Sequence, residues 1–300
     1  MAPTPPFNRQ ELDAALRTVR QAVPPTPQYR WPLLAERYGC EVWVKHENHT
    51  PMGAFKVRGG LTYLEQLAEE GLPPGLVTAT RGNHGQSIPF AAARYGVPVT
   101  VVVPEGNSTD KNRAMRGWGA EVLTHGRDFD EARAFANELA GERGLALVPS
   151  FHPALVRGVA TYALELFTTV QHLDTVYVPI GMGSGICAVI GVRDLLGLDT
   201  EVVGVTAAGA PAYAESFRAG QPRPQPQART FADGVACRDP DAGALKIILA
   251  GAARVLAVTD AEIAEAMRVL FTDTHNVAEG AGAAALAGLA QEQAKQRGKR

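Results

Sequence analysis

Cysteine is scarce in this chain of 300 residues, and its scarcity excludes one class of fold. The three cysteines, Cys40, Cys187 and Cys237, are odd in number and far apart. The disulfide frameworks that hold small secreted domains together need pairs of cysteines at close, regular spacing. The sequence therefore predicts buried thiols and a reducing compartment.

An excess of charge of one sign is also missing. Lys and Arg number 29, and Asp and Glu number 31, so the formal net charge at pH 7 is −2. A chain without a basic excess has no overall field that attracts phosphate backbones or anionic membranes. We therefore expect a small-molecule ligand, and neither a nucleic acid nor a membrane as a partner.

Long hydrophobic runs are absent as well. The longest stretch without a charged residue, 175–192, contains Pro179 and four glycines, and it is shorter than the roughly 20 residues of a membrane-spanning helix. The proline-rich start, residues 1–6, lacks the basic region and the apolar core of a secretion signal. Both observations predict a cytoplasmic protein.

The remaining composition, 46% hydrophobic and 20% charged, is typical of a globular chain, and its length allows about two domains of about 150 residues each. Short β-branched runs alternate with amphipathic segments, as in βαβ units with a parallel sheet. Residues 221–228 contain three prolines and predict a surface loop. The predicted strands are 42–44, 76–79, 97–103, 122–123, 145–148, 176–180, 202–205 and 255–258, and the predicted helices are 8–21, 58–70, 83–95, 110–118, 128–143, 156–171, 186–196, 211–219, 260–273 and 278–291.

The segment KHENHTPMGAFKVRGG, residues 45–60, places Lys56 at the mouth of a helix predicted to begin near Val57. Small and aromatic neighbours such as Phe55 would desolvate the amine, and the helix N-terminus adds positive potential, so both lower the pKa of Lys56. Lysines that form Schiff bases are activated in this way. On spacing alone, a solvated lysine at a helix start is the commoner case.

The segment TRGNHGQS, residues 80–87, follows a predicted strand and opens a helix. Gly82 and Gly85 leave backbone N–H groups accessible there, which predicts a site for a carboxylate or a phosphate. Asn83 can donate and accept hydrogen bonds, and His84 can titrate. Taken alone, Asn83 fits a helix cap equally well, and His84 fits a structural role better than a catalytic one.

A third segment, PIGMGSGI at residues 179–186, also joins a strand to a helix. Gly181, Gly183 and Gly185, with Ser184, offer backbone amides to a phosphate. As a dinucleotide fingerprint the segment is incomplete, because the third glycine is misplaced and Glu201 precedes its strand instead of ending it. By itself such a turn is most often a plain strand-to-helix connection.

The three segments together are far more specific than each alone. They combine a lysine able to form an imine, a site the size of a carboxylate and a site the size of a monophosphate. Pyridoxal phosphate (PLP) needs these components when it acts on an amino acid.

The chain resembles the fold-type II PLP-dependent enzymes, specifically the threonine/serine dehydratase and serine racemase group, over residues 24–290. The resemblance implies an α/β fold with two open, twisted, mainly parallel sheets and flanking helices, like that of the tryptophan synthase β subunit. It also implies a large domain of residues 1–57 and 150–300 and a small inserted domain, 58–149, that closes over the substrate. The resemblance is carried, in order, by KHE and GAFKVRG (45–47, 53–59), GNHGQ (82–86), GMGS (181–184), TFADG (230–234) and EGAG (279–282).

The resemblance further implies roles for single residues. Lys56 would hold PLP as a Schiff base and act as general base, Phe55 would pack against the cofactor ring, and Asn83 would hydrogen-bond its phenolic oxygen. The expected phosphate site comprises Gly181, Met182, Gly183, Ser184 and Gly185, further cofactor contacts are Gly234 and Glu279, and the expected substrate site comprises Arg81, Gly82, Asn83, His84 and Gly85.

The implied reaction is the β-elimination of a β-hydroxy amino acid such as L-threonine or L-serine to a 2-oxo acid and ammonia. An amino-acid racemase or a β-replacement synthase would share the cofactor site. More distant alternatives are a nucleotide-dependent oxidoreductase and an inactive amino-acid sensor. The resemblance also implies a homodimer or a higher homo-oligomer.

The sequence departs from the group at three places. Arg81 replaces the serine that serves racemases as second proton carrier, and a guanidinium does not exchange protons at neutral pH, which favours elimination. Arg81 then either strengthens carboxylate binding or points into solvent. Thr206 replaces a metal-binding glutamate, so we expect no metal there. The sequence stops at Arg300, before the strand and turn that normally meet the pyridine nitrogen, so we expect either an incomplete chain or another partner for that nitrogen.

Overall fold

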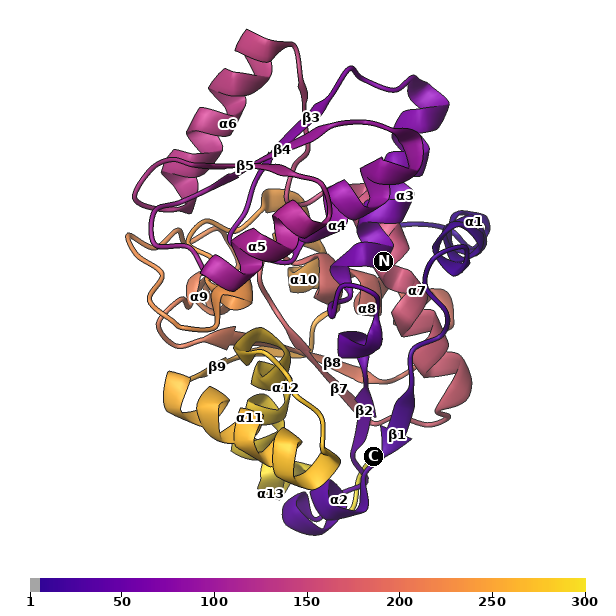
Figure 1. Cartoon of the computed structure of the whole chain (residues 1–300). Helices are drawn as coiled ribbons and strands as arrows, with labels where there is room; N and C mark the ends of the chain where they lie inside the picture. Colours follow the sequence, from indigo (N-terminus) through magenta and orange to yellow (C-terminus); the bar gives the residue numbers. More distant parts are fainter. Residues whose placement is uncertain (1–5) are drawn as a thin grey trace. The chain divides into compact units, whose positions relative to one another are not determined.

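The computed structural model describes residues 6–300 (Figure 1). The proline-rich start predicts a protein without a secretion signal. Except for Pro6, this segment lies outside the described residues. The chain divides into two compact units. Unit 1 comprises Met1–Gln10, Pro25–Asn48 and Tyr162–Arg300, and unit 2 comprises Glu11–Pro24 and His49–Thr161. The domain boundaries implied by the resemblance stay a prediction.

Unit 2 is built on a parallel sheet in the order β5-β4-β3-β6. Every residue of β3 and β4 is buried, as expected for strands covered on both faces. Val77 and Val102 pack against α6, whereas Leu76 and Val101 face the core shared with α3 and α4. The elements are α3 (Lys56–Glu70), β3 (Leu76–Ala79), α4 (His84–Ala92), β4 (Val99–Val103), α5 (Thr109–Gly117), β5 (Glu121–Thr124), α6 (Phe129–Arg143) and β6 (Ala146–Leu147).

Unit 1 contains a parallel sheet, β7-β8-β9, and an antiparallel pair, β1-β2. Helix α12 packs on one face of the parallel sheet with α11 beside it, and α8 packs on the other with α10 beside it (Figure 1). The elements are β1 (Gln28–Arg30), α2 (Pro32–Tyr38), β2 (Trp43–Lys45), β7 (Thr175–Pro179), α8 (Ser184–Leu195), β8 (Glu201–Ala207), α9 (Ala212–Ala219), α10 (Ala242–Gly251), β9 (Arg254–Val258), α11 (Asp260–Thr274), α12 (Gly280–Gln291) and α13 (Gln293–Gln296). Two helices run from one unit into the other, α1 (Arg9–Arg20) and α7 (Pro153–Thr169).

The predicted fold class is confirmed, and each predicted strand and helix is present with ends shifted by a few residues. The three cysteines are buried thiols, as predicted, and none of them is in a disulfide within the described residues. Residues 221–228 form a mostly exposed loop without helix or strand. Within residues 6–300, no helix has both the length and the apolar character needed to cross a membrane.

The sequence missed four elements: β1, α2, α10 and α13. Helix α10, AGALKIILAG, has almost no polar face, so it shows little of the amphipathic period that predicts a helix. Strand β1 has three residues and two of them are exposed, so its sequence carries no alternating pattern.

A buried ion pair joins β2 to α7 within unit 1. The Nζ of Lys45 lies 2.6 Å from Oε2 of Glu165, and the two side chains are 8% and 7% exposed. Lys45 also donates to the carbonyl of Thr26, whose own N–H donates to Glu165. Hydrogen bonds from the backbone therefore support both buried charges.

Replacing Lys45 by Met should lower the free energy of unfolding by about 3–5 kcal/mol, because Glu165 would remain as a buried carboxylate without its cation. Replacing Lys45 by Met and Glu165 by Leu together removes both charges and should recover most of this loss. Urea titration measures both variants. Arg218→Ala, which breaks the exposed pair with Glu215, is the control and should cost less than about 1 kcal/mol. A double variant no more stable than Lys45→Met would contradict this account.

Candidate cofactor and substrate sites

Lys56 is the first residue of α3, one residue earlier than the sequence predicted. Its Nζ lies 5.2 Å from the centre of the Phe55 ring. Burial lowers the pKa of Lys56 from 10.5 to about 8, in the direction that the sequence predicted. About a tenth of this amine is therefore unprotonated, and nucleophilic, at pH 7, far more than for a lysine of ordinary pKa.

The loop that leads into Lys56 is closed by a buried threonine. The Thr50 hydroxyl lies 2.9 Å from both the N–H and the carbonyl of Ala54, and Gly53 between them has a φ of 72°. This is a left-handed conformation that glycine adopts without strain. The sequence analysis gave Thr50 no role, although a threonine four residues before the end of a tight loop is a turn signal.

Helix α3 is held by unusually close backbone contacts to its neighbours within unit 2. A Cβ on Gly60 would lie 2.6 Å from the carbonyl oxygen of Ser87 on α4, and a Cβ on Gly158 of α7 would lie 2.2 Å from that of Arg58. The side chain of Arg58 is completely buried and donates to Thr161. These contacts fix the first turns of α3, and with them the backbone of Lys56.

The turn of residues 81–85 joins β3 to α4, as predicted. A Cβ on Gly85 would lie 2.3 Å from Cγ2 of Thr80, so only glycine fits there. The N–H of Gly82 donates to the Thr80 hydroxyl, and Nζ of Lys111 lies 3.2 Å from where a Cβ on Gly82 would be. Lys111, which the sequence analysis did not single out, therefore places a positive charge beside this turn.

Two polar side chains of this turn have buried atoms without a hydrogen-bond partner among the described residues: Nε2 of His84 and Nε of Arg81. His84 is 7% exposed, and its burial, together with the charge of Lys56, lowers its pKa to about 3. The imidazole is thus neutral at physiological pH. Unsatisfied buried polar atoms are costly in native proteins and commonly mark a site where a ligand binds.

Asn83 precedes α4, but its side chain makes no capping hydrogen bond. Its Oδ1 instead accepts from Nε2 of Gln86 at 3.3 Å. This bond orients the amide so that Nδ2, the donor, faces away from Gln86.

The turn of residues 181–185 joins β7 to α8 in unit 1. Gly183 precedes α8 with a φ of 95°, and a Cβ there would lie 2.7 Å from Cβ of Ala244. Ser184 is 2% exposed. The N-terminus of a twelve-residue helix therefore follows a turn with glycines at positions 181 and 183, which fits the binding of a phosphate.

A distant segment meets this turn at Gly234, and a second one meets Gly234 at Glu279; the resemblance gave both residues as cofactor contacts. A Cβ on Gly181 would lie 2.2 Å from the carbonyl oxygen of Gly234, and a Cβ on Gly234 would lie 3.8 Å from Oε1 of Glu279. Within unit 1 the structure thus brings together residues 181–185, Gly234 and Glu279. Phe55, Lys56 and residues 81–85 belong to unit 2, where the charge of Lys56 reaches His84.

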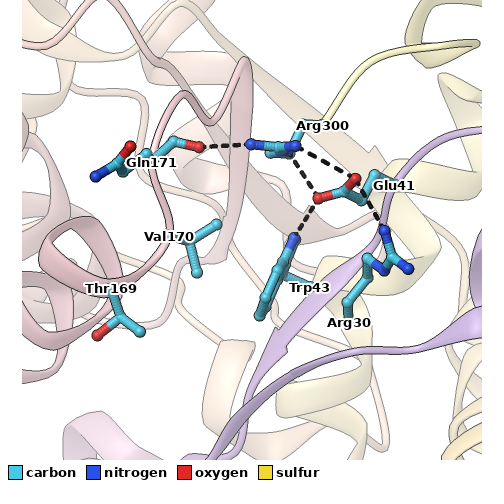
Figure 2. A pocket seen from close by; sticks show the side chains of 7 residues that line it. All are labelled: Arg30, Glu41, Trp43, Thr169, Val170, Gln171 and Arg300. Carbon is cyan, nitrogen blue, oxygen red and sulfur yellow. Dashed lines mark hydrogen bonds and ion pairs between the residues drawn. The ribbon is translucent and has the colours of Figure 1, made fainter.

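A pocket of about 450 Å³ in unit 1 contains none of these residues (Figure 2). At its centre the Glu41 carboxylate accepts from the Trp43 indole and pairs with Arg300 and Arg30. The indole hydrogen bond, with the two guanidinium groups, holds the pKa of Glu41 below its usual value. The pocket is lined by Arg30, Glu41, Trp43, Thr169, Val170, Gln171 and Arg300.

Thr206, where the resemblance would place a metal-binding glutamate, donates to the carbonyl of Leu256 on the neighbouring strand. Across residues 6–300, no group of three or more His, Cys, Asp or Glu side chains is arranged to hold a metal ion. The expectation that this place binds no metal stays a prediction.

Comparison with known proteins gives concordant matches. The model of the family "Pyridoxal-phosphate dependent enzyme" matches residues 19–300. The biosynthetic L-threonine dehydratase of Salmonella typhimurium is 37% identical over 288 residues, 95% of this chain and 56% of that protein. The structure of the processed form of threonine deaminase isoform 2 from Solanum lycopersicum is 26% identical with a TM-score of 0.89, covering 100% of this chain and 90% of that one. Serine racemase from Dictyostelium discoideum is 27% identical with a TM-score of 0.87, covering 98% and 95%.

The chain spans about half the length of the first curated relatives that it matches. The family match nevertheless covers nearly the whole of this chain and includes all the residues of the predicted sites. The chain belongs to the family of pyridoxal-phosphate dependent enzymes.

Proposed function

We propose that the protein is a PLP-dependent ammonia-lyase that converts a β-hydroxy amino acid such as L-threonine or L-serine to a 2-oxo acid and ammonia. The observation that carries the proposal is Lys56, a partly buried amine at the start of α3 whose burial lowers its pKa to about 8. The 37% identity to a protein named threonine dehydratase supports the choice of reaction and substrate.

The residues named above fit this cofactor in kind. When bound, PLP supplies an electron sink for the charge left on Cα when an amino acid loses its α-proton. Lys56 would hold the cofactor, and its amine would take the α-proton as general base. Residues 181–185 would bind the cofactor phosphate, Gly234 and Glu279 would make further contacts to the cofactor, and the Asn83 amide would donate to its phenolic oxygen.

The turn of residues 81–85 takes the substrate carboxylate in this proposal. Unsatisfied buried nitrogens on Arg81 and His84, and the nearby ammonium of Lys111, fit an anionic group. His84 stays neutral because burial lowers its pKa to about 3, so it donates a hydrogen bond without adding a charge.

Arg81 supports elimination over racemisation. A racemase needs a second group that gives and takes a proton on the opposite face of Cα, and a guanidinium stays protonated at any physiological pH. The expected products are therefore a 2-oxo acid and ammonia, without the D-enantiomer of the substrate.

Lys56→Ala should abolish both covalent attachment of PLP and the release of 2-oxo acid from serine or threonine. Absorbance of the protein-bound cofactor and a coupled keto-acid assay measure the two effects. Lys246→Ala is the matched control, because Lys246 is an exposed lysine on α10 and both readouts should stay unchanged. A Lys56→Ala variant that still dehydrates either amino acid would refute the assignment.

Covalent capture of PLP by the apoprotein requires the unprotonated amine of Lys56. With a pKa of about 8, the capture rate should rise about tenfold per pH unit below pH 8 and level off above it. If the lysine had its ordinary pKa of 10.5, the capture rate would keep rising up to about pH 10. Stopped-flow absorbance over this pH range measures the rate profile. The reference amine is Nα-acetyl-lysine, which keeps its side-chain amine. A protein profile that coincides with the reference would contradict a lowered pKa at Lys56.

Several wider features belong to the same proposal. They are a large domain of residues 1–57 and 150–300, a small inserted domain of residues 58–149, a homodimer or higher homo-oligomer, and a cytoplasmic location. Light scattering of the purified protein measures the oligomeric state directly.

A further inference from the structure

Tyr213, on α9 (Ala212–Ala219), contacts the turn of residues 181–185, and its side chain is 1% exposed. Its hydroxyl is 3.2 Å from the carbonyl oxygen of Met182 and 3.1 Å from the backbone nitrogen of Asp241. Asp241 itself caps α10, since its Oδ1 accepts from the N–H of Ala244. One hydroxyl thus connects the turn to the start of α10. Tyr213 lies outside all the motifs that carry the family resemblance.

The direction of both hydrogen bonds follows from their chemistry. A backbone N–H can only donate, so the Tyr213 hydroxyl accepts from Asp241. Its single proton is then left for the carbonyl of Met182, which can only accept. Burial raises the pKa of Tyr213, so the hydroxyl keeps this proton throughout the ordinary pH range.

The orientation of the Met182 carbonyl fixes the amide that follows it. In a planar trans peptide the C=O and the next N–H point in opposite directions. Because the carbonyl of Met182 is directed at Tyr213, the N–H of Gly183 is directed away from it. The side of the turn next to Tyr213 is closed, since a Cβ on Gly183 would lie 2.7 Å from Cβ of Ala244 and 3.4 Å from the Tyr213 hydroxyl oxygen. The N–H of Gly183 is therefore directed toward the opposite side of the turn, where the proposed function places the phosphate.

We propose that Tyr213 is a positioning residue for the cofactor phosphate: by holding the Met182 carbonyl, it aims the N–H of Gly183 at the phosphate without touching the cofactor. This inference rests on the proposed function, in which residues 181–185 bind that phosphate. A positioning role predicts that the contribution of Tyr213 depends on the phosphate group and is absent for a ligand that lacks it.

The test compares PLP with pyridoxal, which has the same ring and aldehyde but no phosphate. Fluorescence titration of the apoprotein gives the Kd of each. Tyr213→Phe frees the Met182 peptide and should weaken PLP about tenfold, the value of one hydrogen bond to a charged group, with the Kd for pyridoxal unchanged. The variant should be less stable as well, because two buried partners lose their hydrogen bond, so stability alone does not report on the role.

Tyr177→Phe is the matched control. The Tyr177 hydroxyl, on β7, also makes two hydrogen bonds, to Glu292 and from Gln296, and neither reaches the turn. Its loss should lower stability and leave the preference for PLP over pyridoxal unchanged. A Tyr213→Phe variant that keeps the full preference, or weakens both ligands equally, would overturn the positioning role.

Replacing Tyr213 by 4-aminophenylalanine retains a donor of nearly the same size. This variant should keep the preference within about threefold of the natural chain, since the N–H still reaches the Met182 carbonyl. If the 4-aminophenylalanine variant lost its preference for PLP over pyridoxal completely, the inference would also be overturned. This test stands even where the Tyr213→Phe variant fails to fold. A natural chain that binds pyridoxal as tightly as PLP would instead overturn the phosphate site itself, and with it the proposed function.

Discussion

The approach of one backbone to another, at places where a Cβ would not fit, is the constraint on which both units depend. In unit 2, Gly60 of α3 lies against the carbonyl oxygen of Ser87 on α4, and Gly158 of α7 lies against the carbonyl oxygen of Arg58 on α3. In unit 1, Gly181 touches the carbonyl of Gly234, and Gly183 touches α10. Any side chain at these positions would push apart the elements that carry the candidate site residues.

Close packing also explains the electrostatic properties of the candidate site. Burial lowers the pKa of Lys56 to about 8 and that of His84 to about 3, and Lys56 adds to the second effect. Both groups are therefore available in their neutral forms near pH 7. On a solvated surface, the pKa of a lysine amine and that of an imidazole would both stay close to their ordinary values. The fold thus prepares nucleophile and hydrogen-bond donor by the same means, removal from water.

The recognisable motifs and the supporting residues differ in kind. Glycine-rich turns and a lysine at a helix start have local sequence signals, because each depends on a few consecutive residues. Thr50 has a local turn signal as well, but Lys111 and Tyr213 lack one, since each acts on a segment that is distant in the chain. Gln86 is a partial exception, because it orients Asn83 from three residues away, a spacing that a helix start makes predictable.

The sequence alone determined the fold class, the parallel strands and most of the helices. Strongly apolar β-branched runs and amphipathic periods are local patterns, so they can be recognised without the tertiary structure. It also determined the position of Lys56 and of the two turns that open α4 and α8. Only the tertiary structure decided that residues 181–185, Gly234 and Glu279 meet, that Asn83 does not cap its helix, and that Tyr213 supports the Met182 carbonyl. The physical reason is that a hydrogen bond or a contact between distant segments depends on how their elements pack, and neither periodicity nor propensity encodes that distance.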